Sequence, residues 1–233
     1  MSETTVSEAN NGSNSQPSNI SEATIRIAGN SQDGIQSIGG FLARLAGRSE
    51  RDVMTMMTIP STISGGASIF QVRLGSGEVL SPGDKADVLF AFYQHSYDGH
   101  IKNLRKGGVM VYDSDHVEPR EECLTDYRHI GIAISSLTVE AIGGTARDKG
   151  KNIYALGLIG RMFSLDTTKL ERLINERFGG KGESVVKTAM DAFQAGYRYY
   201  SDDISNLFRL ARGGAERSNQ VVMSGNEAIG YGL

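Results

Sequence analysis

The segment from Ala23 to Ala46 constrains the fold most, because it reads as a strand, a glycine-bearing turn and a helix. Thr24 to Ala28 (TIRIA) is a short run containing β-branched residues, and Gly29 to Gly34 (GNSQDG) supplies the turn. After the turn, apolar residues recur at helical spacing, at Ile35, Ile38, Phe41, Leu42, Leu45 and Ala46. Such a unit opens doubly wound α/β domains, in which the turn faces a crevice at the strand's carboxyl end.

The turn itself indicates a place for an anion, since free amides and the positive end of a helix suit phosphate or carboxylate. The dinucleotide-binding fingerprint has three glycines, and here only Gly29 and Gly34 stand at matching positions. Asp33 also puts a carboxylate where an anionic ligand would lie. The turn pattern alone therefore leaves open a plain structural turn without a ligand.

The middle of the chain alternates strands with turns and one helix. We predict strands at 52–58, 69–74, 86–93, 109–112 and 131–135, with a short helix at 95–105. A second glycine loop (ISGGAS) spans residues 63–68, and Gly75 to Gly77 predicts a hairpin into residues 78–80. The fold class is therefore α/β, with a Rossmann-like, doubly wound, mostly parallel sheet, an antiparallel hairpin and C-terminal helices.

The remainder of the chain has helical periodicity. We predict helices at 138–147, 152–163, 167–178 and 183–212, a strand at 219–224, and a helix beginning at 225. Asp166 is a suitable N-cap for the third of these helices, and Gly157 and Gly160 are expected to let another element approach closely. Residues 1–21 are rich in Ser, Asn, Thr and Glu and are expected to form a disordered tail.

Composition excludes several classes of function. The 233 residues carry a net charge of −3, which gives no electrostatic case for a nucleic-acid or membrane partner. No apolar run could span a bilayer and no signal pattern is present, so we expect a cytoplasmic protein. The single cysteine, Cys123, and the four histidines have no metal-ligand spacing, so no metal site is predicted.

Four stretches together resemble the 2-oxoacid:ferredoxin oxidoreductases. Residues 25–39 resemble the first βα unit of the gamma module, and residues 63–68 with 71–73 resemble its second glycine loop and the following strand. Lys151 to Ile153 with Ala155 to Gly157 resemble a later helix of that module. Residues 224–230 resemble the start of the pyrimidine-binding thiamine diphosphate module, and this order is typical of the 2-oxoglutarate-type alpha subunit. The family often has Gly where Gln32 stands and Arg where Ser64 stands.

The resemblance implies reversible conversion of a 2-oxoacid and CoA to acyl-CoA, CO2 and reduced ferredoxin. It implies thiamine diphosphate, Mg2+, a [4Fe-4S] cluster and CoA in the full complex, with the thiamine and cluster ligands outside this segment. The implied partners are ferredoxin and a beta subunit with the diphosphate-binding module and cluster, in an (alpha-beta)2 hetero-oligomer. The order of modules favours 2-oxoglutarate, while pyruvate and branched-chain 2-oxoacids remain open.

The resemblance also implies a domain division and a site. Residues 22–214 would form the gamma domain, which covers the active site, and residues 215–233 would begin the pyrimidine-binding domain. No catalytic residue is expected in this segment, and Glu227 is expected to have a capping or structural role rather than to activate the cofactor. The expected CoA-facing residues are Gly29, Asn30, Ser31, Gln32, Gly34, Ser64, Gly65 and Gly66.

Three alternatives to this function remain open at the sequence level. The two glycine loops could only pack against the pyrimidine module. The chain could instead be a stand-alone Rossmann-like nucleotide-binding domain, or a non-catalytic subunit-interaction domain with a tyrosine-rich helix around Tyr197 to Tyr200. Because the last predicted βα unit is cut short at Leu233, we also expect the chain to be a fragment of a longer polypeptide.

Overall fold

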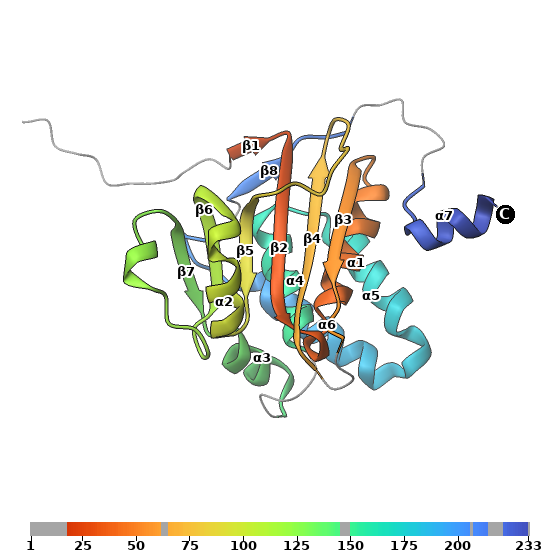
Figure 1. Cartoon of the computed structure of the whole chain (residues 1–233). Coiled ribbons are helices and arrows are strands. Elements are labelled where there is room, and N and C mark those ends of the chain that lie inside the picture. Colours follow the sequence, from red (N-terminus) through yellow and green to blue (C-terminus); the bar gives the residue numbers. More distant parts are fainter. Residues whose placement is uncertain (1–17, 62–64, 145–149, 206, 214–220, 233) are drawn as a thin grey trace, which may run out of the picture.

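The computed structural model describes residues 18–61, 65–144, 150–205, 207–213 and 221–232, and Figure 1 shows their arrangement. The strands are β1 (Ser18–Ile20), β2 (Glu22–Asn30), β3 (Asp52–Thr58), β4 (Ala67–Gly75), β5 (Ala86–Ala91), β6 (Leu104–Asp113), β7 (Arg128–Ile132) and β8 (Phe208–Leu210). The α-helices are α1 (Ile35–Gly47), α2 (Gln94–His100), α3 (Ile134–Ile142), α4 (Lys151–Met162), α5 (Thr167–Phe178), α6 (Glu183–Arg198) and α7 (Gly225–Gly232).

A six-stranded sheet in the order β3-β4-β2-β5-β6-β7 forms the centre of the fold. The strands β2, β5, β6 and β7 are parallel, and β4 lies antiparallel between β2 and β3. The central strand β5 is apolar apart from Asp87, as expected for a parallel strand covered on both faces. The predicted α/β, mostly parallel, doubly wound sheet with C-terminal helices is confirmed.

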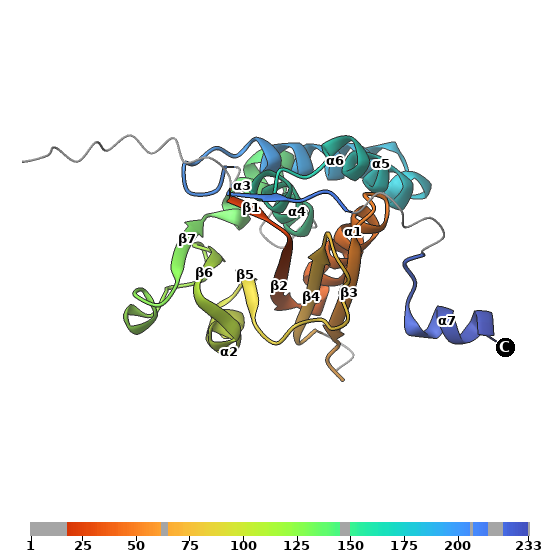
Figure 2. The same cartoon turned by 90° about the horizontal axis from the view of Figure 1, so that it is seen from above.

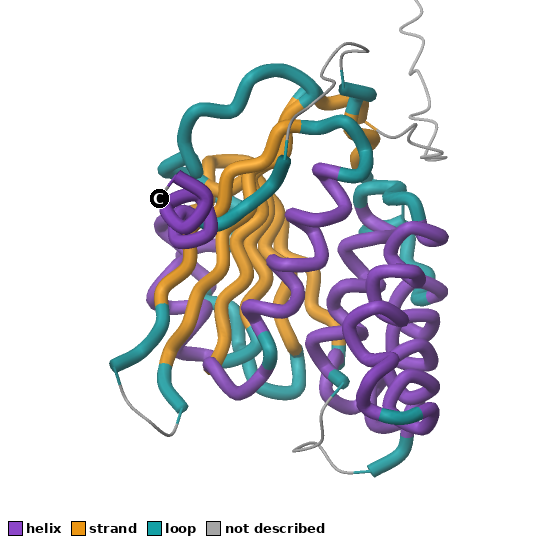
Figure 3. The backbone as a smooth tube through the Cα atoms, turned by 90° about the vertical axis from the view of Figure 1, so that its right-hand side faces the viewer, coloured by secondary structure: helices purple, strands orange, loops and turns teal. Residues whose placement is uncertain are grey.

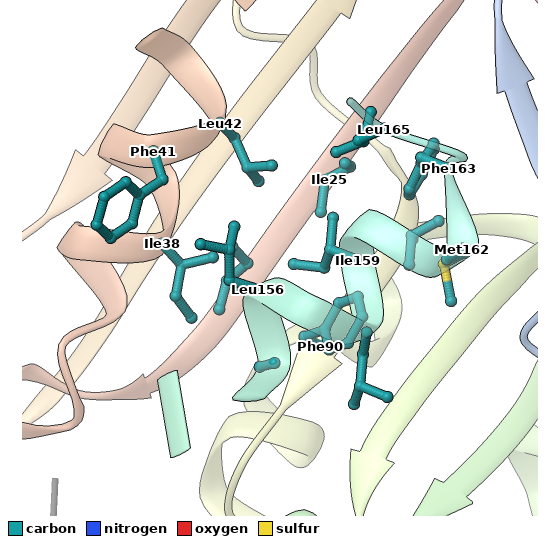
Figure 4. Packing of buried hydrophobic residues seen from close by; sticks show 14 of the residues in the cluster. Ile25, Ile38, Phe41, Leu42, Phe90, Leu156, Ile159, Met162, Phe163 and Leu165 are labelled. Carbon is teal, nitrogen blue, oxygen red and sulfur yellow. The ribbon is translucent and has the colours of Figure 1, made fainter. Parts of the chain in front are cut away.

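Helices cover the two faces of the sheet unequally. Figure 2 shows α1, α3, α4, α5 and α6 on one side of the sheet and α2 on the other. On the thicker side, Leu156 and Ile159 of α4 are fully buried against Ile25, Ile38 and Phe90 (Figure 4). Burying an aliphatic side chain of this size contributes about 1.5–3 kcal/mol, so this layer holds most of the hydrophobic stabilisation.

The helices α4 and α6 run against each other with their backbones unusually close, within the stacked helical layer seen in Figure 3. A Cβ atom at Gly157 would lie 2.3 Å from the carbonyl oxygen of Phe193, and one at Gly196 would lie 2.0 Å from that of Tyr154. At Gly160 the nearest atom would be a Tyr197 ring carbon at 3.4 Å. The predicted close approach is therefore confirmed at Gly157, while Gly160 makes an ordinary side-chain contact.

Several predicted elements differ from the structure. Residues 78–80 form no strand; the antiparallel hairpin joins β3 to β4, because Asp52 to Thr58 pairs along its whole length with residues 69–75. The last long helix, predicted to reach residue 212, ends at Arg198, and β8 follows it. Residues 221–224 are not a strand, and residues 219–220 of that prediction lie outside the described part.

The expected disordered tail spans residues 1–21, and residues 1–17 of it lie outside the described part of the chain. Ser18 to Ile20 form β1, which pairs in parallel with β8, so these residues are held by a partner strand almost 200 positions further along the chain. The rest of the described elements follow the predicted order, including α5 with its Asp166 cap, whose side chain accepts from the Lys169 amide. Among the described residues, no helix is both long and apolar enough to cross a bilayer.

Candidate functional site

The candidate site lies where the chain leaves the two central strands, β2 and β5. β2 and β5 are parallel neighbours, but α1 continues β2 on the thicker side of the sheet and α2 continues β5 on the other side. Their carboxyl ends therefore diverge, and this switch point is where α/β proteins of this type place ligands. The turn after β2 begins at Asn30, and the turn after β5 carries Phe92 and Tyr93.

The two glycine bends, residues 29–34 and 63–68, are separate in the chain, but their described residues meet at this edge of the sheet. The Ser31 amide donates a 3.0 Å hydrogen bond to the carbonyl of Gly66. The Gln32 side-chain amide lies 3.5 Å from the place where a Cβ of Gly65 would stand. The structure thus brings together the predicted residues Gly29, Asn30, Ser31, Gln32, Gly34, Gly65 and Gly66, while Ser64 lies outside the described residues.

Backbone conformation favours glycine at three of these positions: Gly34, Gly65 and Gly66, the last with φ +143°. Gly34 has φ +70° and Gly65 has φ +83°, in the left-handed region that side chains with a Cβ rarely adopt. A Cβ at Gly34 would in addition lie 2.4 Å from the amide nitrogen of Asn152 on α4. The N-terminus of α4 therefore closes against the turn after β2.

Two amides of the turn are not available to an anion. The Asn30 amide donates to Asp33 Oδ2 at 2.9 Å, and the Ser31 amide is used by Gly66. Asp33 thus caps its own turn. The expected phosphate-binding character of the turn is correspondingly weakened.

A chain of polar side chains crosses the switch point. The Tyr93 hydroxyl donates to Asp33 Oδ1 at 3.0 Å, which joins the turn after β5 to the turn after β2. Lys151, the first residue of α4, donates from Nζ to the same hydroxyl oxygen at 3.1 Å. The crevice expected to receive a ligand is therefore bridged by the protein's own side chains.

The chain of contacts continues to the end of β6. Lys151 Nζ lies 3.9 Å from Asp113 Oδ2, and Asp113 is fully buried. Ser135, at the start of α3, donates its hydroxyl to Asp113 Oδ2 at 2.6 Å and its amide to Oδ1 at 3.3 Å. Both charges are hydrogen-bonded, which is the condition under which buried ions are tolerated. We call Asp33, Tyr93, Lys151, Asp113 and Ser135 the edge network.

Aromatic rings surround the buried ammonium of Lys151. Its Nζ lies 4.4 Å from the ring centre of Tyr93 and 5.3 Å from that of Phe92. The exposed rings of His95 and His116 each stack with Tyr93, at 5.5 and 5.6 Å between centres. Cation–π contacts of this kind favour the charged lysine at a largely desolvated position.

Sequence reasoning missed most of the edge network. Lys151 and Asn152 stand out in the sequence only through the family resemblance, and Asp113 is simply the residue after the predicted strand at 109–112. Tyr93 was the last residue of a predicted strand and carried no signal of its own. The one available signal was that Asp33, Tyr93 and Asp113 each lie at or after the end of a predicted parallel strand, and the carboxyl ends of such strands share one edge of the sheet.

Three tyrosines with raised pKa values are expected to make the folded protein less stable in alkali. Burial, together with the charge and hydrogen bond of Asp33, raises the pKa of Tyr93 to about 12, and burial raises those of Tyr97 and Tyr154 to about 12. In unfolded chains tyrosine has a pKa near ~10. The stability contributed by the raised pKa is therefore complete below about pH 10 and is lost as the pH rises toward 12.

We expect Tyr93→Phe to flatten this alkaline fall in unfolding free energy by up to about 1.4 kcal/mol per pH unit. Urea denaturation of wild type and variant between about pH 9 and pH 11.5 measures the slope. Tyr231→Phe, at a tyrosine that is 83% exposed, should leave the slope unchanged. Equal slopes for wild type and Tyr93→Phe would contradict the expectation.

The last described helix begins at a capping pair. Glu227 and Ser224 form a capping box at α7: the Ser224 amide donates to Glu227 Oε2 at 2.6 Å, and the Glu227 amide donates to Ser224 Oγ at 3.2 Å. The expected capping role of Glu227 is confirmed. Within the described ranges, no group of three or more His, Cys, Asp or Glu is placed to hold a metal ion.

Comparison with known proteins gives the family. Residues 24–199, three quarters of the chain, match the family described as pyruvate ferredoxin/flavodoxin oxidoreductase. The chain belongs to this family. The match contains both glycine bends and every residue of the edge network, so the switch-point region is part of the pyruvate ferredoxin/flavodoxin oxidoreductase domain.

Two similar members of the family are named for 2-oxoglutarate. The chain is 28% identical to the 2-oxoglutarate oxidoreductase subunit KorA of Mycobacterium tuberculosis, over 92% of this chain and 37% of that protein. It matches the structure of the 2-oxoglutarate:ferredoxin oxidoreductase from Magnetococcus marinus with 2-oxoglutarate, coenzyme A and succinyl-CoA bound, at 29% identity. That match has a TM-score of 0.80 and covers 91% of this chain and 37% of the other.

The same domain also occurs in a shorter protein. The 2-oxoglutarate synthase subunit KorC of Archaeoglobus fulgidus is 25% identical over 76% of this chain, and the alignment covers 89% of that subunit. The chain thus spans a little over a third of the two longer relatives and most of the shorter one. The pyruvate ferredoxin/flavodoxin oxidoreductase domain is therefore found both fused and separate.

Proposed function

We propose that this chain is the gamma module of a 2-oxoglutarate:ferredoxin oxidoreductase, in which it covers the active site and helps to bind CoA. The observation that carries the proposal is the similarity over 91–92% of the chain to two proteins named for 2-oxoglutarate. The proposed setting is a cytoplasmic complex with a beta subunit and ferredoxin, assembled as (alpha-beta)2. The reaction would convert 2-oxoglutarate and CoA to succinyl-CoA and CO2, with electrons passing to ferredoxin.

The reactive groups would be held outside this segment. Thiamine diphosphate with Mg2+ would supply the decarboxylation chemistry and a [4Fe-4S] cluster would carry single electrons. The described residues offer no ligand set for either metal group, and the one cysteine of the chain cannot hold a cluster alone. The contribution of this chain is therefore proposed to be binding, orientation and exclusion of water.

The residues at the glycine bends fit one part of CoA better than another. The only ammonium in the edge network, that of Lys151, is largely buried and bonded to Tyr93, so it is not free to meet phosphates. Gln32 is exposed and Asn152 is half-buried, and both present neutral amide groups beside backbone that lacks side chains at Gly34 and Gly65. We infer that this surface holds the neutral, amide-bearing pantetheine arm of CoA, and that its phosphates lie elsewhere.

The choice of substrate is tested in the native complex that contains this chain. We expect CoA-dependent reduction of a low-potential acceptor with 2-oxoglutarate, at a kcat/KM at least about tenfold above that for pyruvate or 3-methyl-2-oxobutanoate. A preference for one of the other acids would change the substrate but leave the family assignment intact. No CoA-dependent reduction with any 2-oxoacid would overturn the proposed function.

The CoA-facing surface is tested by Gln32→Ala in the same complex. Losing one neutral hydrogen bond to bound CoA should raise the KM for CoA about three- to tenfold, with little change in the KM for 2-oxoglutarate. Lys187→Ala, at an exposed ion pair on α6, is the matched surface control and should change neither constant. An unchanged KM for CoA in Gln32→Ala would favour the alternative in which the bends only pack against a neighbouring module.

The nucleotide-binding alternative is disfavoured by the switch point itself. A dinucleotide in a doubly wound fold lies across the crevice between the diverging strands. Here that crevice is crossed by the hydrogen bond between Tyr93 and Asp33, and Lys151 of α4 closes it from the helical side.

A further inference from the structure

Arg26 is a buried cation in the middle of β2, on the face of the sheet opposite the thick helical layer. Its neighbours Ile25 and Ile27 point into the main core, whereas Ala28, on the same face as Arg26, packs in the smaller core beside α2. Arg26 is only 5% exposed. Arginine is rarely buried to this extent unless it is paired with an acid.

The described residues give Arg26 one partner, and that partner is neutral. Its Nε donates to Gln71 Oε1 on β4 at 2.6 Å. The Gln71 amide nitrogen in turn donates to the carbonyls of Pro82 and Gly83, so Gln71 is fixed in place from both ends. No described carboxylate lies within 4.0 Å of the Arg26 guanidinium.

A more exposed arginine on the neighbouring strand has the acid that Arg26 lacks. Arg73 on β4 donates from one terminal nitrogen to both carboxylate oxygens of Glu22, at 3.1 and 2.9 Å. The usual arrangement is therefore reversed here, because the better-solvated guanidinium is neutralised and the buried one is not. An uncompensated buried charge is costly, so a position like that of Arg26 calls for a counter-ion.

The terminal nitrogens of Arg26 are able to bind such a counter-ion. They make no hydrogen bond to a described residue, yet they are not among the buried polar atoms that lack a partner, so they retain contact with solvent. A guanidinium bound through Nε alone still presents its terminal nitrogens as a planar pair of donors, which matches the two oxygens of a carboxylate or phosphate.

Arg26 also interacts electrostatically with a second basic side chain. His100 lies at the end of α2, and burial, followed by the positive charges of Arg26 and His95, lowers its pKa. No acid contributes to this shift. The two side chains that the structure links to Arg26 are thus the amide of Gln71 and the imidazole of His100, and neither is an acid.

We propose that Arg26 and His100 bind a small oxyanion, a phosphate or carboxylate group, where β2, β4 and the end of α2 meet. The terminal nitrogens of Arg26 would donate two hydrogen bonds to it, and a ring N–H of His100 would add a third. This site is on the α2 side of the sheet, away from the glycine bends on the carboxyl edge, and it does not depend on the proposed CoA surface.

The test is a titration of the full chain with inorganic phosphate and, separately, acetate, at constant ionic strength set with chloride. Side-chain NMR signals of Arg26 Nε–H and of the His100 ring report the site directly. We expect both NMR signals to shift in a saturable way when at least one of the two anions is added. The anion that binds more tightly identifies the preferred class of ligand. An absence of saturable shifts with both anions would overturn the proposal.

Matched variants separate the site from general surface binding. Arg26→Gln should weaken the anion about tenfold or more, because it removes the charge-assisted fork. Arg73→Gln, at the neutralised arginine on the next strand, should weaken it less than about twofold. Equal losses in the two variants would show non-specific attraction and contradict the proposal. If Arg26→Gln does not fold, Arg26→Lys keeps the charge without the fork and should still lose most of the affinity.

Discussion

Replacing Gly157 by alanine is expected to lower the free energy of unfolding by about 3 kcal/mol, although alanine is the better helix former. The added methyl group would stand 2.3 Å from the carbonyl oxygen of Phe193 and 2.6 Å from the amide nitrogen of Tyr197. Both atoms belong to the backbone of α6, so no side chain can turn away to make room. The two helices would have to separate, and the contacts of the whole helical layer would loosen with them.

The control for this variant is Gly99→Ala. Gly99 lies in α2, and a Cβ there would meet no atom within 4 Å. It should therefore stabilise the protein by up to about 1 kcal/mol, through helix propensity alone. Urea denaturation of the three proteins gives the comparison. A Gly157→Ala protein within about 0.5 kcal/mol of wild type would show that the helices are not held this closely in solution.

Replacing Lys151 by methionine is expected to cost about 3–5 kcal/mol of unfolding free energy. Methionine keeps much of the buried stem but removes the ammonium between Tyr93 and Asp113. Asp113, which is fully buried, would keep its bonds to Ser135 but lose its only nearby cation among the described residues. The cost is that of leaving a buried charge uncompensated, and it greatly exceeds the value of the hydrogen bond itself.

Lys187→Met is the matched control, because Lys187 forms an ion pair with Asp191 but is 78% exposed. Exposed pairs of this kind contribute little, so a change below about 1 kcal/mol is expected. The double variant Lys151→Met with Asp113→Asn should recover part of the loss, since the buried carboxylate is then gone. Additive losses in the double variant would mean that the two charges do not interact and would contradict the edge network as described.

Local pattern was sufficient for much of the fold. The helical spacing from Ile35 onward and the Asp166 cap gave α1 and α5 with little error, because these signals depend only on near neighbours. The apolar composition of residues 86–91 identified a central parallel strand in the same way. The partner of β4 could not be found like this. Strand pairing depends on long-range register, and the short Gly75 to Gly77 turn suggested a hairpin that the chain does not make.

The candidate site was predictable only in part. Backbone signals, above all glycine at left-handed positions such as Gly34 and Gly65, located both bends correctly. The side chains that cross the switch point could not be read locally, because Lys151 reaches Tyr93 from a helix almost 120 residues after the first turn. A single buried lysine at the start of a helix looks like an ordinary surface residue in the sequence, and only the tertiary fold reveals its partners.

The small ribbon of β1 and β8 has a consequence for how such a module is used. It sets Ser18 beside Phe208, so the chain enters and leaves the domain side by side. A unit whose entrance and exit adjoin can be spliced into a larger protein, or released from one, without rebuilding its interior. Such a unit can therefore be joined to a larger protein or separated from it during evolution without any change in its central sheet.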